Sequence, residues 1–368
     1  SYAFKISLIL HLLFLIIRPL GARKNYNTLL KKWISFYQER QKKPCYELLV
    51  KSTEKKSSED TMDDIAVDIG GTQLRAALYP PEGLEARVIQ SIPTAGEKPA
   101  LERLFDLIAS IWPENGAVRS IALGVAGALN PQSGVVYQVP NIPNWNGLNI
   151  IELTAKRFNV PVRLGNDANL AALGEWKYGA GVGHHNLIYL TISTGVGGGI
   201  IVNDRLLLGE NGLGAEVGHI TVLPGGPLCG CGHPGHLESM SSGTGIANHV
   251  IRQIQAGRKT ILANNNQTPT ARLVAEAALQ GDELALEAFN IAGEFLGRAI
   301  ADLLHLFNPT MVILGGGVIK SGELILNPVR RALLDAVISP QYLEGFKLTT
   351  ARLGDRVGLM GALALARA

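Results

Sequence analysis

The order of hydrophobic and polar residues changes in character after residue 61. From Met62 to the end, short runs of β-branched and other apolar residues alternate with segments whose apolar residues recur every three or four positions. The first pattern predicts buried strands, and the second predicts amphipathic helices. Because the two patterns alternate along the chain, they indicate an α/β protein.

Several elements can be placed from this pattern. The apolar spacing in 100–112 and in 285–307 predicts two helices. A third helix is expected over 166–176, capped by Asn166 or Asp167. Strands are expected at 64–70, 74–79, 120–129, 161–167, 186–193 and 200–207, with a further passage into a strand at 308–317. The glycine-rich stretch 194–199 is expected to be a loop.

The two halves of this region resemble each other. DIGGTQLRAALY at 68–79 and TISTGVGGGIIV at 191–202 each contain the end of a strand, a loop with glycine and threonine, and a returning strand. We infer an internal duplication, with a small domain at 62–182, a larger one at 183–368 and a cleft between them. Ligands favour such clefts. The C-terminal helix is expected to pack back on the small domain.

The composition excludes several classes of protein. Hydrophobic residues make up 46% of the 368 residues and charged residues 18%, which is typical of a globular chain and not of a disordered one. A chain of this length can form two domains that each bury a core. Three cysteines are too few for a disulfide framework, so we expect a reducing compartment, the cytoplasm.

The first 61 residues differ from the rest in charge. They contain 12 Lys and Arg against 5 Asp and Glu, whereas 62–368 contain 22 basic and 26 acidic residues. Their apolar run at 6–17 is shorter than the ~20 residues that span a bilayer. We expect 1–61 to be an upstream extension, from a mis-assigned start, without a role in the chemistry; a membrane anchor is the alternative. Since 62–368 is mildly acidic, we expect it to bind neither nucleic acid nor a membrane.

Two glycine loops are candidates for binding phosphate. In DIGGT at 68–72, Asp68 ends a strand, and the N–H groups of the following loop can surround an anion while the aspartate supports Mg²⁺ through water. By itself this loop is also typical of a plain hairpin turn. The second loop, at 194–199, favours a pair that holds a polyphosphate. Strands follow both loops, which excludes a dinucleotide-binding motif, and neither has the Lys of a Walker A loop. A third glycine run, at 314–317, could let an adenine approach the backbone.

Polar residues between these loops suit a polyhydroxylated ligand. Asp167 lies where a strand meets a helix, and an aspartate there can accept the proton of an attacking hydroxyl. A plain N-cap is the alternative for this position. Glu216, His219 and Glu238, together with Asn141 in PNIPNWNG, offer donors and acceptors for hydroxyl groups. Surface solvation explains any one of these residues but explains the set poorly.

The stretch CGCGHPGH at 229–236 has the composition of a metal site. It holds two of the three cysteines, one residue apart, and two histidines, and His219 precedes it by ten residues. Thiolate and imidazole are ligands that zinc prefers. From the residues alone, such a metal could serve the chemistry, the fold or neither.

Together these motifs resemble the ROK family of bacterial sugar kinases and repressors, within the actin-like ATPase superfamily. The matches follow the order of the family from Met62 to the C-terminus: DIGGT at 68–72, PNIPNW at 140–145, GND at 165–167, TGVGGG at 194–199, EVGH at 216–219, CGCGHPGHLE at 229–238 and LGGG at 314–317. The resemblance implies a two-domain actin-like ATPase fold, a duplicated ribonuclease H-like unit with an interdomain cleft. It also implies an ATP-dependent hexokinase that transfers the γ-phosphoryl group to the 6-hydroxyl of a hexose.

The resemblance implies a role for each matching position. Asp167 would be the general base. The other sugar hydroxyls would be bound by Asn141, Asn166, Glu216, His219 and Glu238. The ATP phosphates and Mg²⁺ would be bound by Asp68, Gly70, Gly71, Thr72, Thr194, Gly195, Gly197 and Gly198, and adenosine by Gly315 and Gly316.

The implied metal is a structural zinc ion, and here the chain departs from the family. The family uses the histidine of ExGH and three cysteines, and the third cysteine falls where this chain has His236. The set His219, Cys229, Cys231 and His236 still fills a tetrahedral shell. One thiolate fewer makes the site less anionic and weaker. His233 is an alternative ligand, and loss of the zinc is the other alternative.

Two other classes of function share some of these motifs. The family includes sugar-responsive transcriptional repressors with an N-terminal winged helix, but 1–61 lacks a turn between two amphipathic helices. An actin-like ATPase without a sugar substrate fits the phosphate loops but not EVGH or the metal stretch. Among sugars, glucose is the first choice, and N-acetylglucosamine and N-acetylmannosamine are alternatives. The resemblance alone implies a homodimer or homotetramer.

Overall fold

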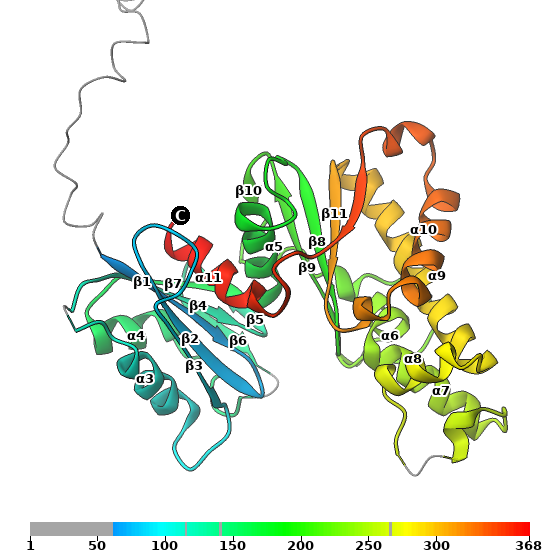
Figure 1. Ribbon diagram of the computed structural model, residues 1–368, viewed down its shortest axis with the longest axis horizontal. Coiled ribbons are helices and arrows are strands. Elements are labelled where there is room, and N and C mark those ends of the chain that lie inside the picture. The colour runs from blue at the N-terminus through cyan, green and yellow to red at the C-terminus, as the bar shows by residue number, and fades with distance from the viewer. Residues whose placement is uncertain (1–61, 115, 140–141, 265–266) are drawn as a thin grey trace, which may run out of the picture. The chain divides into compact units, whose positions relative to one another are not determined.

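The computed structural model describes residues 62–114, 116–139, 142–264 and 267–368 (Figure 1). The expected extension at 1–61 and the candidate sugar ligand Asn141 lie outside the described residues. Within the described part of the chain, no helix combines the length and the apolar character that crossing a membrane requires.

Five strands form the first sheet, in the order β3-β2-β1-β4-β7. They are β1 (Asp63–Ile69), β2 (Gln73–Tyr79), β3 (Val88–Pro93), β4 (Val118–Val125) and β7 (Val162–Asn166). β2 pairs antiparallel with both β1 and β3, whereas β4 pairs parallel with both β1 and β7. The apolar runs of β1 and β4 are buried almost throughout, as expected for central strands whose two faces are both covered.

The second sheet repeats the first in strand order and direction, β10-β9-β8-β11-β12. Its strands are β8 (Leu187–Ile192), β9 (Val196–Val202), β10 (Arg205–Leu206), β11 (Met311–Gly315) and β12 (Lys347–Thr350). Again the first three strands pair antiparallel and the last two join in parallel. This repeat confirms the predicted α/β class and the predicted duplication. A separate hairpin consists of β5 (Ala128–Asn130) and β6 (Val135–Gln138).

Helices pack around both sheets. They are α3 (Ala100–Ser110), α4 (Ile150–Phe158), α5 (Asp167–Tyr178), α6 (Leu237–Ser241), α7 (Gly243–Gln255), α8 (Ala271–Leu279), α9 (Glu283–Phe307), α10 (Glu323–Ala336) and α11 (Val357–Ala366). The two helices predicted from apolar spacing are confirmed as α3 and α9, and the helix predicted from its cap at 166–176 is confirmed as α5. Short 3-10 turns include η3 (Val217–His219), η4 (Ile261–Asn264), η5 (Val318–Ser321), η6 (Pro340–Leu343) and η7 (Gly354–Arg356).

Helices α5 and α11 each connect one sheet to the other (Figure 1). α5 follows β7 of the first sheet and packs on β8 and β9 of the second, while α11 follows β12 of the second sheet and packs on β1 and β4 of the first. The two helices touch closely, because a Cβ at Gly361 of α11 would lie 2.0 Å from the carbonyl oxygen of Leu170 in α5. Glycine is therefore required at this helix crossing.

The predicted loop at 194–199 is wrong in its second half, because Gly197, Gly198 and Gly199 belong to strand β9. Helix α5 packs directly on this strand. A Cβ at Gly199 would lie 2.4 Å from the Cβ of Ala172, and one at Gly197 would lie 3.0 Å from the Cβ of Ala168. These glycines are therefore explained by the close approach of the helix to the strand and not by a flexible loop.

Two predicted strands are interrupted. The strand expected at 200–207 is split into β9 and β10 by Asn203 and Asp204, whose φ angles of 50° and 63° form a two-residue hairpin turn. The strand expected at 120–129 is split into β4 and β5, and Gly127 between them has a φ of 148°. Both breaks occur at residue types that tolerate positive φ.

Candidate active site

The first glycine turn joins β1 to β2. The backbone N–H of Gly70 donates to the carbonyl of Gln73 at 2.9 Å, which closes the turn around Gly71 and Thr72. The hydroxyl of Thr94 donates to the carbonyl of Gly70 at 2.7 Å and ties the turn to the end of β3. The backbone N–H of Thr94 donates to the carbonyl of Thr72 at 2.9 Å, so the turn is fixed at both ends, as a preorganised anion site requires.

Asp68, at the end of β1, is paired with Arg75 on the neighbouring strand. The two residues lie opposite each other in the register of β1 and β2, and Arg75 Nε donates to Asp68 Oδ2 at 3.1 Å. A second nitrogen of the same guanidinium also contacts Asp68, and Nη1 donates to the carbonyl of Asp355 at 2.8 Å. Arg75 is not among the predicted site residues. Its position opposite Asp68 follows from the hairpin register, since residues directly opposite in an antiparallel pair share a face.

Asn166 and Asp167 occupy the junction of β7 and α5. Asn166 is the N-cap: its Oδ1 accepts from the N–H groups of Ala168 and Asn169 at 2.9 and 3.2 Å. Its Nδ2 donates to the carbonyl of Gly127 at 3.1 Å. The capping interpretation therefore applies to Asn166 and not to Asp167, which is the first residue of the helix.

Asp167 has an unusual protonation equilibrium. Burial raises the pKa of its carboxyl group to about 6, and the negative charges of Asp68 and Glu216 add to this effect, while the backbone N–H of Ala168 opposes it. A carboxylate with such a pKa is ionised at neutral pH and still basic enough to accept a proton. Because the charges of Asp68 and Glu216 both act on Asp167, we call these three residues the acidic group.

The second glycine turn, Ser193 to Gly195, connects β8 to β9. The N–H of Ser193 donates to the carbonyl of Gly195 at 2.9 Å. The start of α7 holds this turn, because the N–H of Gly243 donates to the carbonyl of Ser193 at 2.7 Å and the hydroxyl of Thr244 donates to that of Thr194 at 2.8 Å. This turn is equivalent in the second sheet to the turn at Gly70 in the first.

Glu238 lies at the start of α6 and contacts both the second turn and the metal stretch. Its Oε2 accepts from the N–H of Val196 at 3.0 Å, and its Oε1 accepts from the thiol of Cys229 at 3.2 Å. A Cβ at Gly195 would lie 2.3 Å from Oε2, so glycine is needed for the carboxylate to approach. Glu216, the other predicted acceptor in this region, is exposed.

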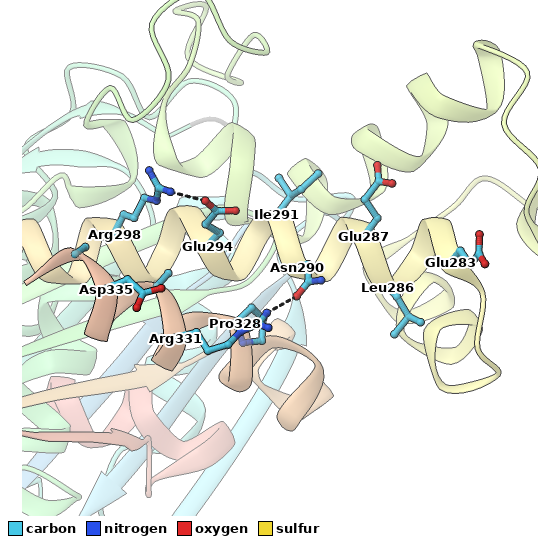
Figure 2. A pocket seen from close by; sticks show the side chains of 12 residues that line it. Glu283, Leu286, Glu287, Asn290, Ile291, Glu294, Arg298, Pro328, Arg331 and Asp335 are labelled. Atoms are coloured by element: carbon cyan, nitrogen blue, oxygen red, sulfur yellow. Dashed lines mark hydrogen bonds and ion pairs between the residues drawn. The ribbon is translucent and has the colours of Figure 1, made fainter.

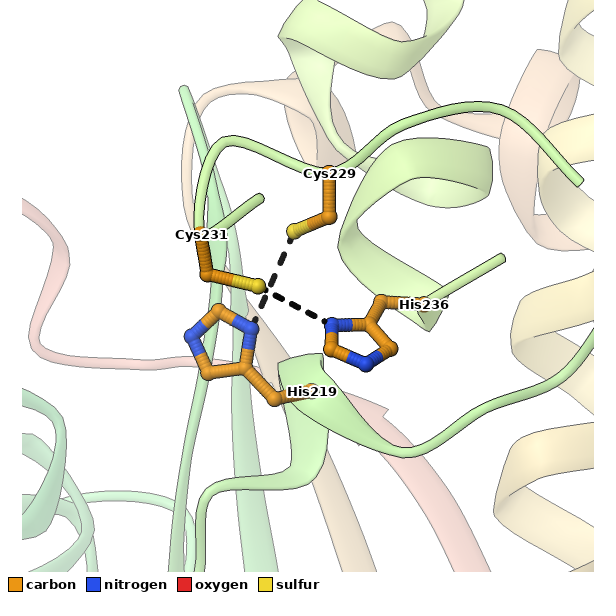
Figure 3. A group of neighbouring side chains, drawn as sticks. All are labelled: His219, Cys229, Cys231 and His236. Atoms are coloured by element: carbon orange, nitrogen blue, oxygen red, sulfur yellow. Dashed lines mark hydrogen bonds between the residues drawn. The ribbon is translucent and has the colours of Figure 1, made fainter. Parts of the chain in front are cut away.

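The four predicted metal ligands converge (Figure 3). The ligand atoms of His219, Cys229, Cys231 and His236 all lie within 4.8 Å of one another. Nδ1 of His219 is 3.8 Å from Sγ of Cys229, and Nδ1 of His236 is 3.2 Å from Sγ of Cys231. Zinc bonds of about 2.3 Å to sulfur and about 2.0 Å to nitrogen place such atoms about 3.5 Å apart in a tetrahedron. The residues present therefore fit a four-coordinate zinc ion.

Without a bound cation, the surroundings of Cys229 favour its protonated thiol. Burial, together with the hydrogen bond to Glu238, raises the pKa of this thiol to about 12. A cation bound to the sulfur would reverse this preference, because a coordinating thiol is deprotonated. His233, the alternative ligand, is exposed and does not belong to the four-residue group.

The third glycine run, at the end of β11, forms a tight turn. Gly315 is the last residue of the strand, and a Cβ there would lie 2.3 Å from the hydroxyl oxygen of Tyr189. Gly316 has a φ of 92°, and a Cβ there would lie 2.3 Å from the carbonyl oxygen of Ile192 in β8. Only glycine fits both positions, because the Tyr189 side chain and the Ile192 backbone occupy the space that a side chain would need.

An open groove of about 880 Å³ along α9 and α10 contains none of the predicted site residues (Figure 2). Its charged residues are partly paired with one another: Arg298 contacts Glu294 at 2.6 Å, and Arg331 donates to Asn290 at 2.9 Å. The groove therefore does not coincide with the candidate active site.

Comparison with known proteins places the chain in a family. The model of the ROK family matches residues 64–368. The chain belongs to the ROK family. Among its ROK relatives, the glucokinase of Thermotoga maritima is 32% identical over 306 residues, which cover 82% of this chain and 96% of that protein. The xylose repressor of Caldicellulosiruptor bescii is 31% identical over 274 residues, which cover 72% of this chain and 67% of the repressor.

A solved ROK structure supports the same assignment. The ROK family glucokinase from Streptomyces griseus, in complex with glucose and AMPPNP, has a TM-score of 0.68 and 34% identity, and the match covers 83% of this chain and 99% of that one. This likeness confirms the two-domain actin-like ATPase fold that the motifs predict.

Proposed function

We propose that this protein is an ATP-dependent hexokinase that transfers the γ-phosphoryl group of ATP to the 6-hydroxyl of glucose. The observation that carries the proposal is Asp167, a carboxylate at the first position of α5 with a pKa raised to about 6. Such a group is ionised at neutral pH and suited to take the proton of a sugar hydroxyl as its oxygen attacks phosphorus. The glucokinases among the ROK relatives support the same reaction.

The other predicted residues would hold the sugar. In this proposal the remaining hydroxyls of glucose bond to the side chains of Asn141, Asn166, Glu216, His219 and Glu238. Asn166 has one amide hydrogen engaged by Gly127, which leaves the second N–H of the same amide for a ligand. These contacts would orient O6 toward Asp167, and positioning of this kind is the largest part of phosphoryl-transfer catalysis.

The two glycine turns would hold the ATP phosphates. Asp68, Gly70, Gly71 and Thr72 supply the first turn, and Thr194 and Gly195 supply the second. Gly197 and Gly198 lie within β9 and would support the second turn from the strand, while Gly315 and Gly316 would line adenosine. Mg²⁺ would arrive with the nucleotide near Asp68, because the acidic group of Asp68, Asp167 and Glu216 favours a divalent cation.

A structural zinc ion completes the proposal. His219, Cys229, Cys231 and His236 would hold it, and the ion would crosslink the segments that carry Glu216 and Glu238. It would fill its shell with protein ligands, so it would take no part in transfer. We further propose that the enzyme works in the cytoplasm as a homodimer or homotetramer and binds no nucleic acid.

Two alternatives are tested together with this proposal. An N-acetylglucosamine or N-acetylmannosamine kinase would use the same base and turns. A sugar-responsive transcriptional repressor is suggested by the xylose repressors among the relatives. The closed glycine turns and the perturbed Asp167 favour a kinase, because a pure sensor needs no general base.

A coupled ATP assay on the full chain discriminates between these functions. We expect turnover with glucose to exceed turnover with mannose, xylose and both acetamido sugars, and we expect NMR of the product to locate the phosphate on O6. Faster turnover with an acetamido sugar would identify that sugar, and not glucose, as the substrate. ATP hydrolysis that is independent of sugar, or sugar-sensitive DNA binding without turnover, would overturn the proposal.

A further inference from the structure

Glu175 in the last turn of α5 is hydrogen-bonded to both segments that pass from one sheet to the other. Between α5 and β8, its Oε2 accepts from the N–H of Ala180 at 2.7 Å. Between β12 and α11, its Oε1 accepts from the N–H groups of Arg352 and Leu353, both at 2.8 Å. The two crossings are far apart in sequence, so this carboxylate is a junction between them.

The residues around Glu175 bury its carboxylate and leave space for it. The side chain is fully buried, at 0% exposure, and a buried carboxylate is tolerated only when hydrogen bonds replace its water. A Cβ at Gly179 would lie 2.0 Å from Oε2, so glycine is required there. The backbone carbonyl of Glu175 also accepts from the N–H groups of Gly179 and Gly181, at 3.1 and 2.8 Å. Removing the carboxylate would leave three N–H groups, in partly buried hydrogen bonds, without their acceptor.

Helix α5 and the second crossing each lead from Glu175 to one acidic residue of the candidate active site. Asp167 begins the same helix, two turns or about 12 Å away along its axis. The second crossing continues to Asp355, whose carbonyl accepts from Arg75, the partner of Asp68. It then enters α11, where a Cβ at Gly358 would lie 2.6 Å from Oδ2 of Asp68. Glu175 thus joins the supports of Asp167 and Asp68.

The geometry points to Glu175 as a positioning residue that fixes Asp167 relative to Asp68 by locking both crossings to α5. This inference rests on the proposed function for the roles of the two aspartates. The attachment of both crossings to α5 rests only on the contacts of Glu175. Glu175 is remote from the transferred phosphoryl group and acts through the backbone that it holds. A displacement of about 1 Å at a reacting group can cost about 100-fold in rate.

The test is Glu175→Gln in the full chain, because the carboxamide keeps the shape and replaces one acceptor oxygen by a donor. With glucose and ATP we expect kcat to fall by about 10-fold to 100-fold while both KM values change by less than about 3-fold. Hydrogen exchange of the ligand-free protein should become faster in 351–358 and in the first turn of α5. If Glu175→Gln does not fold, Gly179→Ala, which displaces the carboxylate without removing it, is measured in the same way.

Asp64→Asn is the matched control. Asp64 is also a fully buried carboxylate, on β1, bonded to Arg119 of β4 and to Arg367 at the far end of α11. Its bonds to these two residues lie away from the backbone at 180, 352 and 353 that Glu175 binds. The Asp64→Asn variant should have a lower melting temperature, while its kcat and the hydrogen exchange of 351–358 stay near wild type. Equal kcat loss in both variants, or unchanged kcat with faster exchange only at Ala180, would reduce Glu175 to a structural role and overturn the inference.

Failure of the proposed function gives a different result. If the wild-type protein phosphorylates no hexose, the kinase proposal fails. The exchange data alone then test whether Glu175 holds the two crossings. Faster exchange in both 351–358 and the first turn of α5 of Glu175→Gln, absent in Asp64→Asn, then supports it. Exchange that is unchanged in either segment overturns it.

Discussion

The carboxylate of Glu238 accepts a hydrogen bond from the backbone N–H of Val196 at 3.0 Å, across 42 positions of sequence. The same carboxylate accepts from the thiol of Cys229. Glu238 therefore connects the metal stretch to the second glycine turn. The connection depends on the absence of a side chain at Gly195, because a Cβ added there would lie 2.3 Å from Oε2 of Glu238.

Gly195→Ala should break this connection. The added methyl group displaces the carboxylate of Glu238 and leaves the N–H of Val196 without its charged acceptor. We expect the free energy of unfolding to fall by about 2 kcal/mol. We also expect the KM for ATP to rise by about 10-fold, because the second turn loses its support. Denaturant unfolding and initial rates at varied ATP measure the two effects.

Gly230→Ala is the control for this substitution. Its Cβ would lie 3.7 Å from Oε1 of Glu238, an ordinary contact with the same carboxylate. The stability of this variant should stay within about 0.5 kcal/mol of wild type. An equal rise of the ATP KM in both variants would show that Glu238 does not transmit the effect.

The pH dependence of activity should report Asp167. Burial and two neighbouring carboxylates raise its pKa to about 6, from an ordinary value of 3.8. The base must be ionised, so kcat/KM for glucose should be level above pH ~6 and fall about 10-fold per pH unit below it. Rates measured between pH 5 and 8, in the range where the protein stays folded, test this. A profile that is flat down to about pH 5 would contradict the assignment of Asp167.

Asp167→Asn should lower activity and raise stability. Because the folded-state pKa is raised, ionised Asp167 destabilises the fold, and the stability that wild type has below pH ~4 is lost as the pH rises through about 6. At pH 7 the variant should gain up to about 3 kcal/mol and lose at least about 100-fold in kcat. The gain should disappear toward pH ~4.

Asp106→Asn is the control for this stability effect. Asp106 is 61% exposed on α3 and pairs with Lys98, so its removal should change stability by less than about 0.5 kcal/mol at any pH. Chemical denaturation at pH ~4 and ~7 compares the two variants. A loss of stability at neutral pH in Asp167→Asn would show that its charge is well accommodated.

Much of the fold could be predicted because its determinants are local. The apolar spacing that forms α3 and α9 lies within each helix, and the capping of α5 by Asn166 involves neighbouring residues only. Strands and turns repeat in both halves, which makes the duplication visible in the motifs. The candidate metal ligands were also found, since cysteine and histidine at short spacing carry a distinctive chemistry.

The remaining features depend on contacts between distant residues. Gly197 and Gly199 look like loop glycines in the sequence, and only the close approach of Ala168 and Ala172 from α5 shows their packing role. The bonds of Glu175 to the backbone at 352 and 353 span 177 and 178 positions, and they involve N–H groups that every such residue has. No side-chain pattern could have indicated them.

Zinc binding should depend on His236 and not on His233. Nδ1 of His236 is 3.2 Å from Sγ of Cys231, within the four-residue cluster, whereas His233 is exposed and outside it. We expect one zinc ion per wild-type chain, and His236→Ala should lower zinc affinity by at least about 100-fold, since loss of outer-shell partners alone costs 10-fold to 100-fold. His236→Cys should bind more tightly than wild type by adding a thiolate. Competition with a chromophoric chelator measures each affinity, and His233→Ala serves as the control. Zinc lost in His233→Ala but retained in His236→Ala would assign the fourth ligand to His233.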